Sequence, residues 1–409
     1  MKIGIVSPFF YPWYGGVTEQ VGYLYRHLKK RGHDVRVITP FDGREVLDDP
    51  ADLIKTGRTV PFPANGSIAP VPLLLGGSGR AAAIMELEQF DVLHLHQPLF
   101  NLLCLSFLKA VRQARRSGKR TPRVFGTFHA SGGRIERFAV RVSAWYLRRF
   151  IPFIDEPIAV SEAARAFVAP IVNDGIRIIP NGIDIRRFAS DGRSTSEHPT
   201  HSTDDVIDLL YVGRLEPRKK VSILLESLAF IPRFTSRKFR LTLVGNGPGT
   251  SCYRRRIPVE MRDRVRFAGK VGADELPAFY RRATIFCSPA AYGESFGIVL
   301  IEAMAAGVAI VAGRNEGYQR LLRDHENALL VNPIDPLVLA KSLAEVIDSE
   351  PLRRRLVEQG YATAKRFDNS LLISEMEQLY TRGTPGRSYP GPAKEVVEKN
   401  KPERIPVLS

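Results

Sequence analysis

Short apolar segments alternate with segments of helical periodicity along most of this sequence, and the alternation limits the folds open to it. The first unit consists of the apolar segment 2–7, a glycine pair at 15–16 and a helical segment, and the next apolar segment follows at 35–38. A strand, a glycine loop, a helix and a second strand in this order predict parallel strands joined by crossover helices. We therefore expect an α/β fold built from doubly wound sheets.

The alternation occurs twice, and a polar segment separates the two halves. A chain of 409 residues is longer than one hydrophobic core usually serves, so two domains are expected. We assign residues 1–188 to an N-terminal Rossmann-like domain, 189–206 to a polar linker and 207–367 to a C-terminal Rossmann-like domain. A helix at 368–382 is expected to pack back toward the N-terminal domain, and residues 383–409 are expected to form a mobile tail.

The formal net charge of +16 requires either an anionic partner or a solvated basic surface to explain it. Nucleic acid, an anionic membrane and phosphorylated ligands all fit, and charge alone does not choose among them. The three cysteines, Cys104, Cys252 and Cys287, lack the spacing of a metal site, and no apolar run is long enough to span a bilayer. These features favour a reducing compartment, so the cytoplasm is the expected location.

Residues 134–153 have the pattern of a basic amphipathic helix. One face carries four arginines: Arg134, Arg137, Arg141 and Arg148. Another face carries apolar and aromatic side chains: Phe138, Val142, Trp145 and Tyr146. Such a helix can lie on an anionic bilayer surface, but the same pattern serves a crossover helix packed on a sheet, so both interpretations stay open.

An almost wholly apolar helix is expected between Phe296 and Gly307, with Ser295 capping its start and Gly307 ending it in a left-handed conformation. Glu302 is the only ionisable residue inside it. A carboxylate in apolar surroundings is costly unless something hydrogen-bonds it, and a sugar diol is a suitable partner. Glu294 lies just before the positive end of this helix, where a diphosphate could also bind. A buried helix whose one charged residue reaches solvent is the alternative interpretation.

Basic residues follow the first strand of the second domain at Arg214, Arg218 and Lys219. They can neutralise a diphosphate leaving group in place of a metal, and the chain has no Asp-x-Asp motif for a metal-bound nucleotide. The first loop lacks the full Gly-x-Gly-x-x-Gly fingerprint, which disfavours a nicotinamide-dependent enzyme. In the first domain, His96 and His129 end two strands, at the edge where ligands bind in open α/β sheets.

Together these motifs resemble the family 4 retaining glycosyltransferases of the GT-B fold, and among them the bacterial phosphatidylinositol α-mannosyltransferases. The matching motifs span most of residues 1–335 in the family's order: Gly15-Gly16-Val17, Thr127-Phe128-His129, Ala159-Val160-Ser161, Pro180-Asn181-Gly182-Ile183-Asp184, Gly213-Arg214, Pro217-Arg218-Lys219, and Glu294 with Glu302. The resemblance implies two Rossmann-like domains that face each other across a cleft.

The resemblance also implies roles for the matching residues. Glu302 would bind the ribose hydroxyls, and Glu294 would bind the transferred sugar. Arg214 and Lys219 would hold the diphosphate, while His129 would lie beside the anomeric carbon and the acceptor. The implied catalytic set is thus His129, Glu294, Arg214 and Lys219. The other implied donor-binding residues are Gly15, Gly16, Arg218, Lys270, Val271, Ser295, Phe296, Gly297, Ile298 and Glu302, with Lys270 and Val271 bordering the base.

Acceptor binding is implied for a second set of residues: Phe9, Thr18, Asn65, Ser67, Thr127 and His129. The chain departs from the phosphatidylinositol group at three positions, where Phe9 replaces a tyrosine, Thr18 a glutamine and Pro70 an arginine. Lys220 also replaces a glycine that commonly follows the lysine of the basic motif.

The main functional hypothesis is transfer of mannose from GDP-mannose to phosphatidylinositol or a related lipid, with retention of configuration, at the cytoplasmic membrane face. On this hypothesis no cofactor is required, although a divalent metal is compatible with the sequence. The partners are a nucleotide sugar, a lipid or saccharide acceptor and an anionic membrane surface. A UDP-sugar donor with another acceptor is the alternative. A nucleic-acid-binding protein would explain the charge but not the pairing of Glu294 with Glu302, so no nucleic acid partner is expected.

Overall fold

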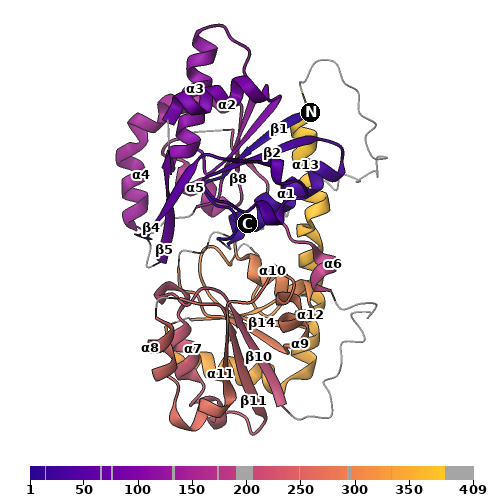
Figure 1. Cartoon of the computed structure of the whole chain (residues 1–409). Helices are drawn as coiled ribbons and strands as arrows, with labels where there is room; N and C mark the ends of the chain where they lie inside the picture. Colours follow the sequence, from indigo (N-terminus) through magenta and orange to yellow (C-terminus); the bar gives the residue numbers. More distant parts are fainter. Residues whose placement is uncertain are drawn as a thin grey trace, which may run out of the picture.

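The computed structural model of the chain contains two α/β domains, which lie one above the other in Figure 1. The structure describes residues 1–13, 15–64, 67–74, 77–130, 134–172, 175–189, 206–247, 249–292, 294, 296–319, 321–332 and 334–382. The predicted tail and nearly all of the predicted linker lie outside these residues.

The N-terminal domain is built on a sheet of seven parallel strands in the order β3-β2-β1-β6-β7-β8-β9. Its strands are β1 (Lys2–Val6), β2 (Asp34–Thr39), β3 (Leu53–Lys55), β6 (Val92–His96), β7 (Arg123–Phe128), β8 (Glu156–Ala159) and β9 (Arg177–Ile178). The α-helices of this half are α1 (Gly16–Lys30), α2 (Gly77–Glu88), α3 (Leu102–Arg116), α4 (Arg134–Leu147), α5 (Glu162–Val168) and α6 (Ile185–Phe188). The strand order reverses between β1 and β6, which is the point where doubly wound sheets bind ligands.

The C-terminal domain repeats the plan with six parallel strands in the order β12-β11-β10-β13-β14-β15. Its strands are β10 (Val206–Val212), β11 (Lys238–Val244), β12 (Val265–Gly269), β13 (Ile285–Ser288), β14 (Ala309–Gly313) and β15 (Leu329–Val331). Its α-helices are α7 (Val221–Ser227), α8 (Thr250–Arg255), α9 (Leu276–Arg282), α10 (Ile298–Ala305), α11 (Pro336–Asp348) and α12 (Glu350–Ala364). The two doubly wound sheets confirm the fold class predicted from the alternating pattern.

The last helix, α13 (Asn369–Thr381), leaves the C-terminal domain and lies beside α1 of the N-terminal domain (Figure 1). Its apolar side chains, such as Ile373 and Tyr380, are buried in the same core as the residues of β1 and β2. Glu377 forms ion pairs with Arg31 and with His33, whose Nε2 lies 2.8 Å from the carboxylate. The helix therefore ties the end of the described chain to the N-terminal domain.

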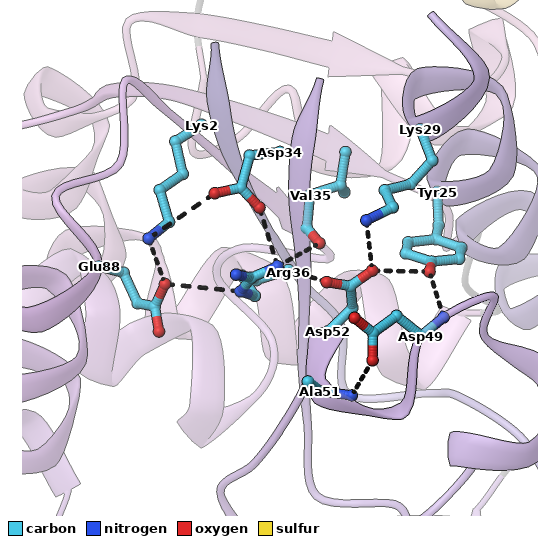
Figure 2. A network of polar contacts seen from close by, with 10 residues as sticks. All are labelled: Lys2, Tyr25, Lys29, Asp34, Val35, Arg36, Asp49, Ala51, Asp52 and Glu88. Atoms are coloured by element: carbon cyan, nitrogen blue, oxygen red, sulfur yellow. Dashed lines mark hydrogen bonds and ion pairs between the residues drawn. The ribbon is translucent and has the colours of Figure 1, made fainter. Parts of the chain in front are cut away.

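A network of charged residues lies where β1, β2 and β3 of the N-terminal sheet begin (Figure 2). Asp52, whose side chain is 1% exposed, lies at its centre. Its carboxylate accepts a 2.8 Å hydrogen bond from the Tyr25 hydroxyl, lies 2.8 Å from the Lys29 ammonium and pairs with Arg36. Two cations and a hydroxyl offset the cost of burying this carboxylate, so we assign the network to stability.

The start of α10 differs from the sequence-based prediction. The helix begins at Ile298 with Gly297 at the N-cap position, two residues after the predicted start, and the predicted cap Ser295 lies outside the described residues. Gly297 at the N-cap position has a left-handed backbone with φ 87°, and a Cβ there would lie 2.9 Å from Leu300 and Tyr318 side-chain atoms. The predicted end is confirmed, because Gly307 is left-handed with φ 71° and the Val308 N–H bonds to the Ala303 carbonyl.

The predicted helix 134–153 is also shorter than expected. The α-helix ends at Leu147, and residues 148–153 form 3₁₀ turns that contain Pro152. Proline lacks an N–H and disfavours α geometry in the residue before it, which explains the early end. The structure also contains elements that were not predicted from the sequence, namely α2, α3 and the antiparallel hairpin of β4 (Gly57–Ala64) and β5 (Ser67–Leu74). Within the described part of the chain, no helix has both the length and the apolar character needed to cross a membrane.

Candidate active site

A cavity of about 510 Å³ lies between the two domains, which we call the interdomain cavity. Both domains line it: Trp13, Glu19 and Tyr23 come from the N-terminal side, whereas Val212 ends β10 and Asn246 follows β11 in the C-terminal domain. Many residues predicted to bind the donor are among its lining residues: Gly15, Gly16, Arg214, Lys270, Val271, Ile298 and Glu302. The structure thus brings together residues up to 287 positions apart, from Gly15 to Glu302, around one space large enough for a nucleotide sugar.

Glu302 is held at the wall of the interdomain cavity by a tyrosine that sequence reasoning missed. The hydroxyl of Tyr280 on α9 donates a 2.7 Å hydrogen bond to its carboxylate. Burial raises the pKa of Glu302 to about 7, while the hydrogen bond from Tyr280 acts in the opposite direction. Glu302 is therefore an oriented acceptor that ionises near neutral pH, as recognition of a diol requires.

The starts of two helices from opposite domains meet at the interdomain cavity. A Cβ placed on Gly16, the first residue of α1, would lie 3.0 Å from the Cδ1 of Ile298, the first residue of α10. A side chain at position 16 would therefore crowd the end of the Ile298 side chain. Helix starts carry unpaired N–H groups and partial positive charge, so their convergence favours an anion such as a diphosphate.

Lys219 and Arg218 both contact a single carboxylate oxygen of Glu294. The Lys219 ammonium lies 2.7 Å from this Oε1 atom, and the Arg218 guanidinium lies 2.6 Å from it. All three side chains are largely buried. Burial lowers the pKa of Lys219, and the attraction of Glu294 opposes that change. Glu294 and Lys219, two members of the predicted catalytic set, are thus in direct contact.

Glu216 completes this ion cluster and was also missed by sequence reasoning. Its side chain is 1% exposed and lies 2.9 Å from both the Arg214 and the Arg218 guanidinium groups. Three cations and two carboxylates leave the cluster with one excess positive charge. Arg214, one of the predicted phosphate-binding cations, also lines the interdomain cavity, so the ion cluster borders this cavity. The sequence signal that could have identified Glu216 is its position between Arg214 and Arg218, as an acidic residue inside a basic motif.

His129 belongs to a buried row of three histidines on β6 and β7. Its Nε2 atom lies 2.9 Å from the Nδ1 atom of His96, whose ring stacks on that of His94 at 4.5 Å. His94 in turn contacts the Tyr380 hydroxyl at 2.5 Å and the Thr127 hydroxyl at 2.7 Å. Burial lowers the pKa of His94 and of His129 to about 3, so both rings are neutral at pH 7.

The histidine row borders a second, much smaller cavity of about 20 Å³ and not the interdomain cavity. Both His96 and His129 line this small cavity, and the Nε2 atom of His96 and the Nδ1 atom of His129 make no hydrogen bond within the described structure. His129 therefore has one ring nitrogen without a protein partner. His129 and Arg214, which were predicted to act together, therefore line different cavities.

The predicted acceptor residues are only partly brought together. The hydroxyl of Thr18 is buried and donates to the Trp13 carbonyl at 2.7 Å, and that of Thr127 contacts His94. Because these hydroxyls have internal partners, this arrangement does not support their direct contact with an acceptor. Phe9 is partly exposed, Asn65 lies outside the described residues, and Ser67 begins β5.

Two further residues predicted to bind the donor, Ser295 and Phe296, precede α10 in the sequence. Phe296 packs edge-on against Phe367 with ring centroids 5.4 Å apart, and Ser295 lies outside the described residues. Within the part of the chain that the structure describes, no three His, Cys, Asp or Glu side chains are grouped so that they could hold a metal ion.

Two models of known protein families match the chain. The model described as Glycosyltransferase Family 4 matches residues 14–187, and the model described as Glycosyl transferases group 1 matches residues 194–363. The first match covers most of the N-terminal domain, and the second covers nearly all of the C-terminal domain.

Individual proteins match over almost the whole length. The chain is 34% identical to the phosphatidyl-myo-inositol mannosyltransferase of Mycobacterium tuberculosis, over 93% of this chain and 96% of that protein. It is 28% identical to the D-inositol 3-phosphate glycosyltransferase of Acidothermus cellulolyticus, over 87% and 84% respectively. The structure of HepE from Anabaena in complex with UDP superposes with a TM-score of 0.71 at 18% identity, over 93% of this chain and 100% of that chain.

Proposed function

Because this chain belongs to the family 4 glycosyltransferases, as its sequence predicted, we propose that it transfers mannose from GDP-mannose to phosphatidylinositol or a related membrane lipid. The glycosyltransferase activity and the GT-B fold follow from the family itself. The choice of mannose and of an inositol lipid is supported by the relatives that are named as phosphatidyl-myo-inositol mannosyltransferases, at 30–34% identity.

The interdomain cavity carries the donor-binding part of this proposal. Glu302 would accept hydrogen bonds from the ribose hydroxyls, with Lys270 and Val271 beside the base. The diphosphate would lie between the starts of α1 and α10 and reach Arg214. Arg214 belongs to the ion cluster that carries one excess positive charge. Glu294 would bind hydroxyls of the mannose, which places the sugar at the end of the cavity nearest Lys219.

Transfer with retention would then proceed on one face of the sugar. The bond between the anomeric carbon and the β-phosphate oxygen breaks, and the acceptor oxygen bonds to the same face of that carbon. The acceptor proton passes to the departing phosphate oxygen. Arg214 and Lys219 stabilise the charge that develops on this oxygen, which is the step where electrostatic stabilisation accelerates the reaction. His129 would lie beside the reacting atoms.

An anionic membrane surface is the proposed partner of α4. Phe138, Val142 and Trp145 recur at helical spacing and are 69%, 57% and 74% exposed, whereas Val140 and Ala144 face the core. Arg141 beside this stripe is exposed, and the Arg149 guanidinium lies over the Trp145 and Tyr146 rings. Large apolar side chains between arginines fit the boundary between headgroups and acyl chains of an anionic bilayer. Such a surface would bring the protein to a lipid acceptor.

A UDP-sugar is the second candidate donor, because the structural neighbour HepE holds UDP in its complex. The deciding experiment incubates the purified protein with GDP-mannose, UDP-glucose or UDP-N-acetylglucosamine, with and without phosphatidylinositol vesicles, and determines product mass. We expect a mannosylated lipid only when GDP-mannose and the inositol lipid are both present. Turnover with a UDP-sugar alone would reject the mannose assignment, and mannosylation of vesicles that lack the inositol lipid would reject the acceptor.

A further inference from the structure

Gln97, the residue that follows β6, has an unusual backbone conformation for a residue with a long side chain. Its φ is 61°, which lies in the left-handed region that glycine and asparagine adopt far more readily than glutamine. The side chain is buried, with 8% exposure. A strained backbone of this kind persists only where surrounding contacts enforce it, and such residues cluster at functional sites.

Two hydrogen bonds, one to β7 and one from the residue that caps α3, hold the Gln97 main chain. Its N–H donates to the Thr127 carbonyl at 2.7 Å, which extends the pairing of β6 and β7 beyond the last paired strand residues. Its carbonyl accepts a 2.6 Å hydrogen bond from the Asn101 side chain. Asn101 is itself fixed, because its other side-chain atom caps the first turn of α3.

The Gln97 side chain points to the segment that carries His129. Its amide oxygen accepts a 2.7 Å hydrogen bond from the His129 N–H and a longer one, 3.3 Å, from the Ala130 N–H. The residue before it, His96, contacts the His129 ring at 2.9 Å. Consecutive residues at the end of β6 therefore hold both the main chain and the imidazole of His129.

We propose that Gln97 is a positioning residue for glycosyl transfer: its side-chain amide fixes the backbone at the end of β7 and so orients the imidazole of His129. This inference rests on the proposed place of His129 beside the reacting atoms. Gln97 does not line the interdomain cavity, so it acts on the transfer step and leaves donor binding unchanged.

The test uses substitutions that separate the backbone strain from the side-chain contact. Asparagine adopts the left-handed region more readily than glutamine, but its amide is one methylene shorter and does not reach the His129 N–H. Glutamate keeps both the length and an acceptor oxygen. Gln89 provides a matched control, because it is an exposed glutamine with φ 50° at the opposite end of β6.

We expect Gln97→Asn to keep or raise the melting temperature while kcat for mannosyl transfer falls on the order of 10- to 100-fold, the loss that misplacement of a reacting group causes. The KM for the donor should stay within about twofold, because the substrate-binding cavity is untouched. Gln97→Glu should restore most of the lost kcat. Gln89→Asn should raise stability similarly and leave kcat unchanged.

Two outcomes would overturn the inference. An unchanged kcat in Gln97→Asn would show that the amide is dispensable, and a loss of kcat that matches a loss of folded protein would show a purely structural role. His129→Ala is assayed in parallel to separate the two levels of the proposal. If His129→Ala retains full transfer, the proposed place of His129 fails, whereas an inactive His129→Ala beside a fully active Gln97→Asn rejects only the role of Gln97.

Discussion

Lys219 lies 2.7 Å from the carboxylate of Glu294, in a pocket where both side chains are largely buried. The two residues stand on different elements and would face different parts of one substrate, the diphosphate and the sugar. The same Glu294 oxygen also forms an ion pair with Arg218, so removal of Glu294 would take away the carboxylate that Lys219 and Arg218 share. This carboxylate therefore partly neutralises the two cations, and its contact with Lys219 joins the residues proposed to hold the sugar and the diphosphate.

Lys219→Ala should lower kcat on the order of 100- to 1,000-fold, because the leaving phosphate would lose a preorganised cation, at about 3–4 kcal/mol. Glu294→Ala should cause a loss of similar size. Initial rates at saturating GDP-mannose and lipid provide the measurement. The double variant should lose less than the product of the two single losses, because the residues act as one unit. Multiplicative losses would indicate that the two side chains act independently.

Lys220→Gly should stabilise the protein modestly and serve as a charge control for Lys219. Lys220 has φ 54° and ψ 32°, a left-handed conformation that strains a side-chain-bearing residue by about 1–2 kcal/mol. The greater freedom of glycine in the unfolded chain offsets about 0.5–1 kcal/mol, so a net gain of up to about 1 kcal/mol is expected in urea unfolding. Activity should remain within about twofold of the unmodified protein. A destabilised variant would mean that the Lys220 side chain makes a contribution larger than its strain.

Asp52→Ala should lower the free energy of unfolding by about 3 kcal/mol without changing donor affinity, because it breaks a buried ion network far from the interdomain cavity. Asp49→Ala is the matched control. Asp49 is exposed, and its carboxylate accepts a 2.8 Å hydrogen bond from the Ala51 N–H at the start of the same 3₁₀ turn, so loss of this side chain should cost about 1 kcal/mol or less. Equal losses in the two variants would remove the distinction between the network and a simple cap.

The sequence predicted the parts of this structure that depend on local pattern. Both sheets, the left-handed end of α10 at Gly307 and the gathering of predicted donor residues around one cavity follow from alternation, glycine placement and the rule that ligands bind where parallel strands end. The hairpin of β4 and β5 was missed because its prolines, including Pro61 and Pro63, argue against a strand in sequence analysis, although an isolated hairpin tolerates them.

The contacts that orient the site were not predictable in the same way. Tyr280 reaches Glu302 from another helix, and the histidine row joins side chains 33 positions apart, so neither has a local signature. The strained backbone of Gln97 is a property of its tertiary contacts and is invisible in a single sequence. Lys220 stands where a glycine is common, and the structure shows that its backbone is left-handed, with φ 54° and ψ 32°.

Trp145→Ser on α4 should weaken binding to vesicles that contain anionic phospholipid, because a large aromatic side chain would no longer enter the interface. Arg141→Glu should weaken binding further at low salt and less at high salt, since it acts through the surface potential. Co-sedimentation with vesicles at several salt concentrations measures both. Leu87→Ser is the control, because Leu87 is 82% exposed but lies on α2. An equal loss of vesicle binding in Leu87→Ser would indicate nonspecific hydrophobic adsorption. Unchanged vesicle binding in Trp145→Ser would leave α4 with a structural role alone.

Donor affinity should rise with pH through the range around pH 7 because of Glu302. Only the carboxylate form accepts hydrogen bonds at both oxygens from the ribose diol, and burial raises the pKa of Glu302 to about 7. Below that value each pH unit should weaken donor binding about tenfold. The same shift has the opposite sign for the folding of the empty protein: a carboxyl whose folded pKa is raised contributes stability below its unfolded pKa, and this contribution is lost as pH rises through about 7.

Tyr280→Phe tests the origin of this pH dependence. The hydrogen bond from Tyr280 lowers the pKa of Glu302, so its removal should move the midpoint of the affinity profile to higher pH. At pH 7 the variant should bind the donor more weakly than the unmodified protein, and by pH 9 the two affinities should be equal. Titration calorimetry with GDP-mannose between pH 5.5 and 9 gives the profile. Glu302→Gln should bind weakly at every pH and show a flat profile, together with a stability that no longer falls between about pH 4.5 and pH 7. A profile that keeps its slope in Glu302→Gln would assign the titration to another group and leave Glu302 without the proposed role in ribose recognition.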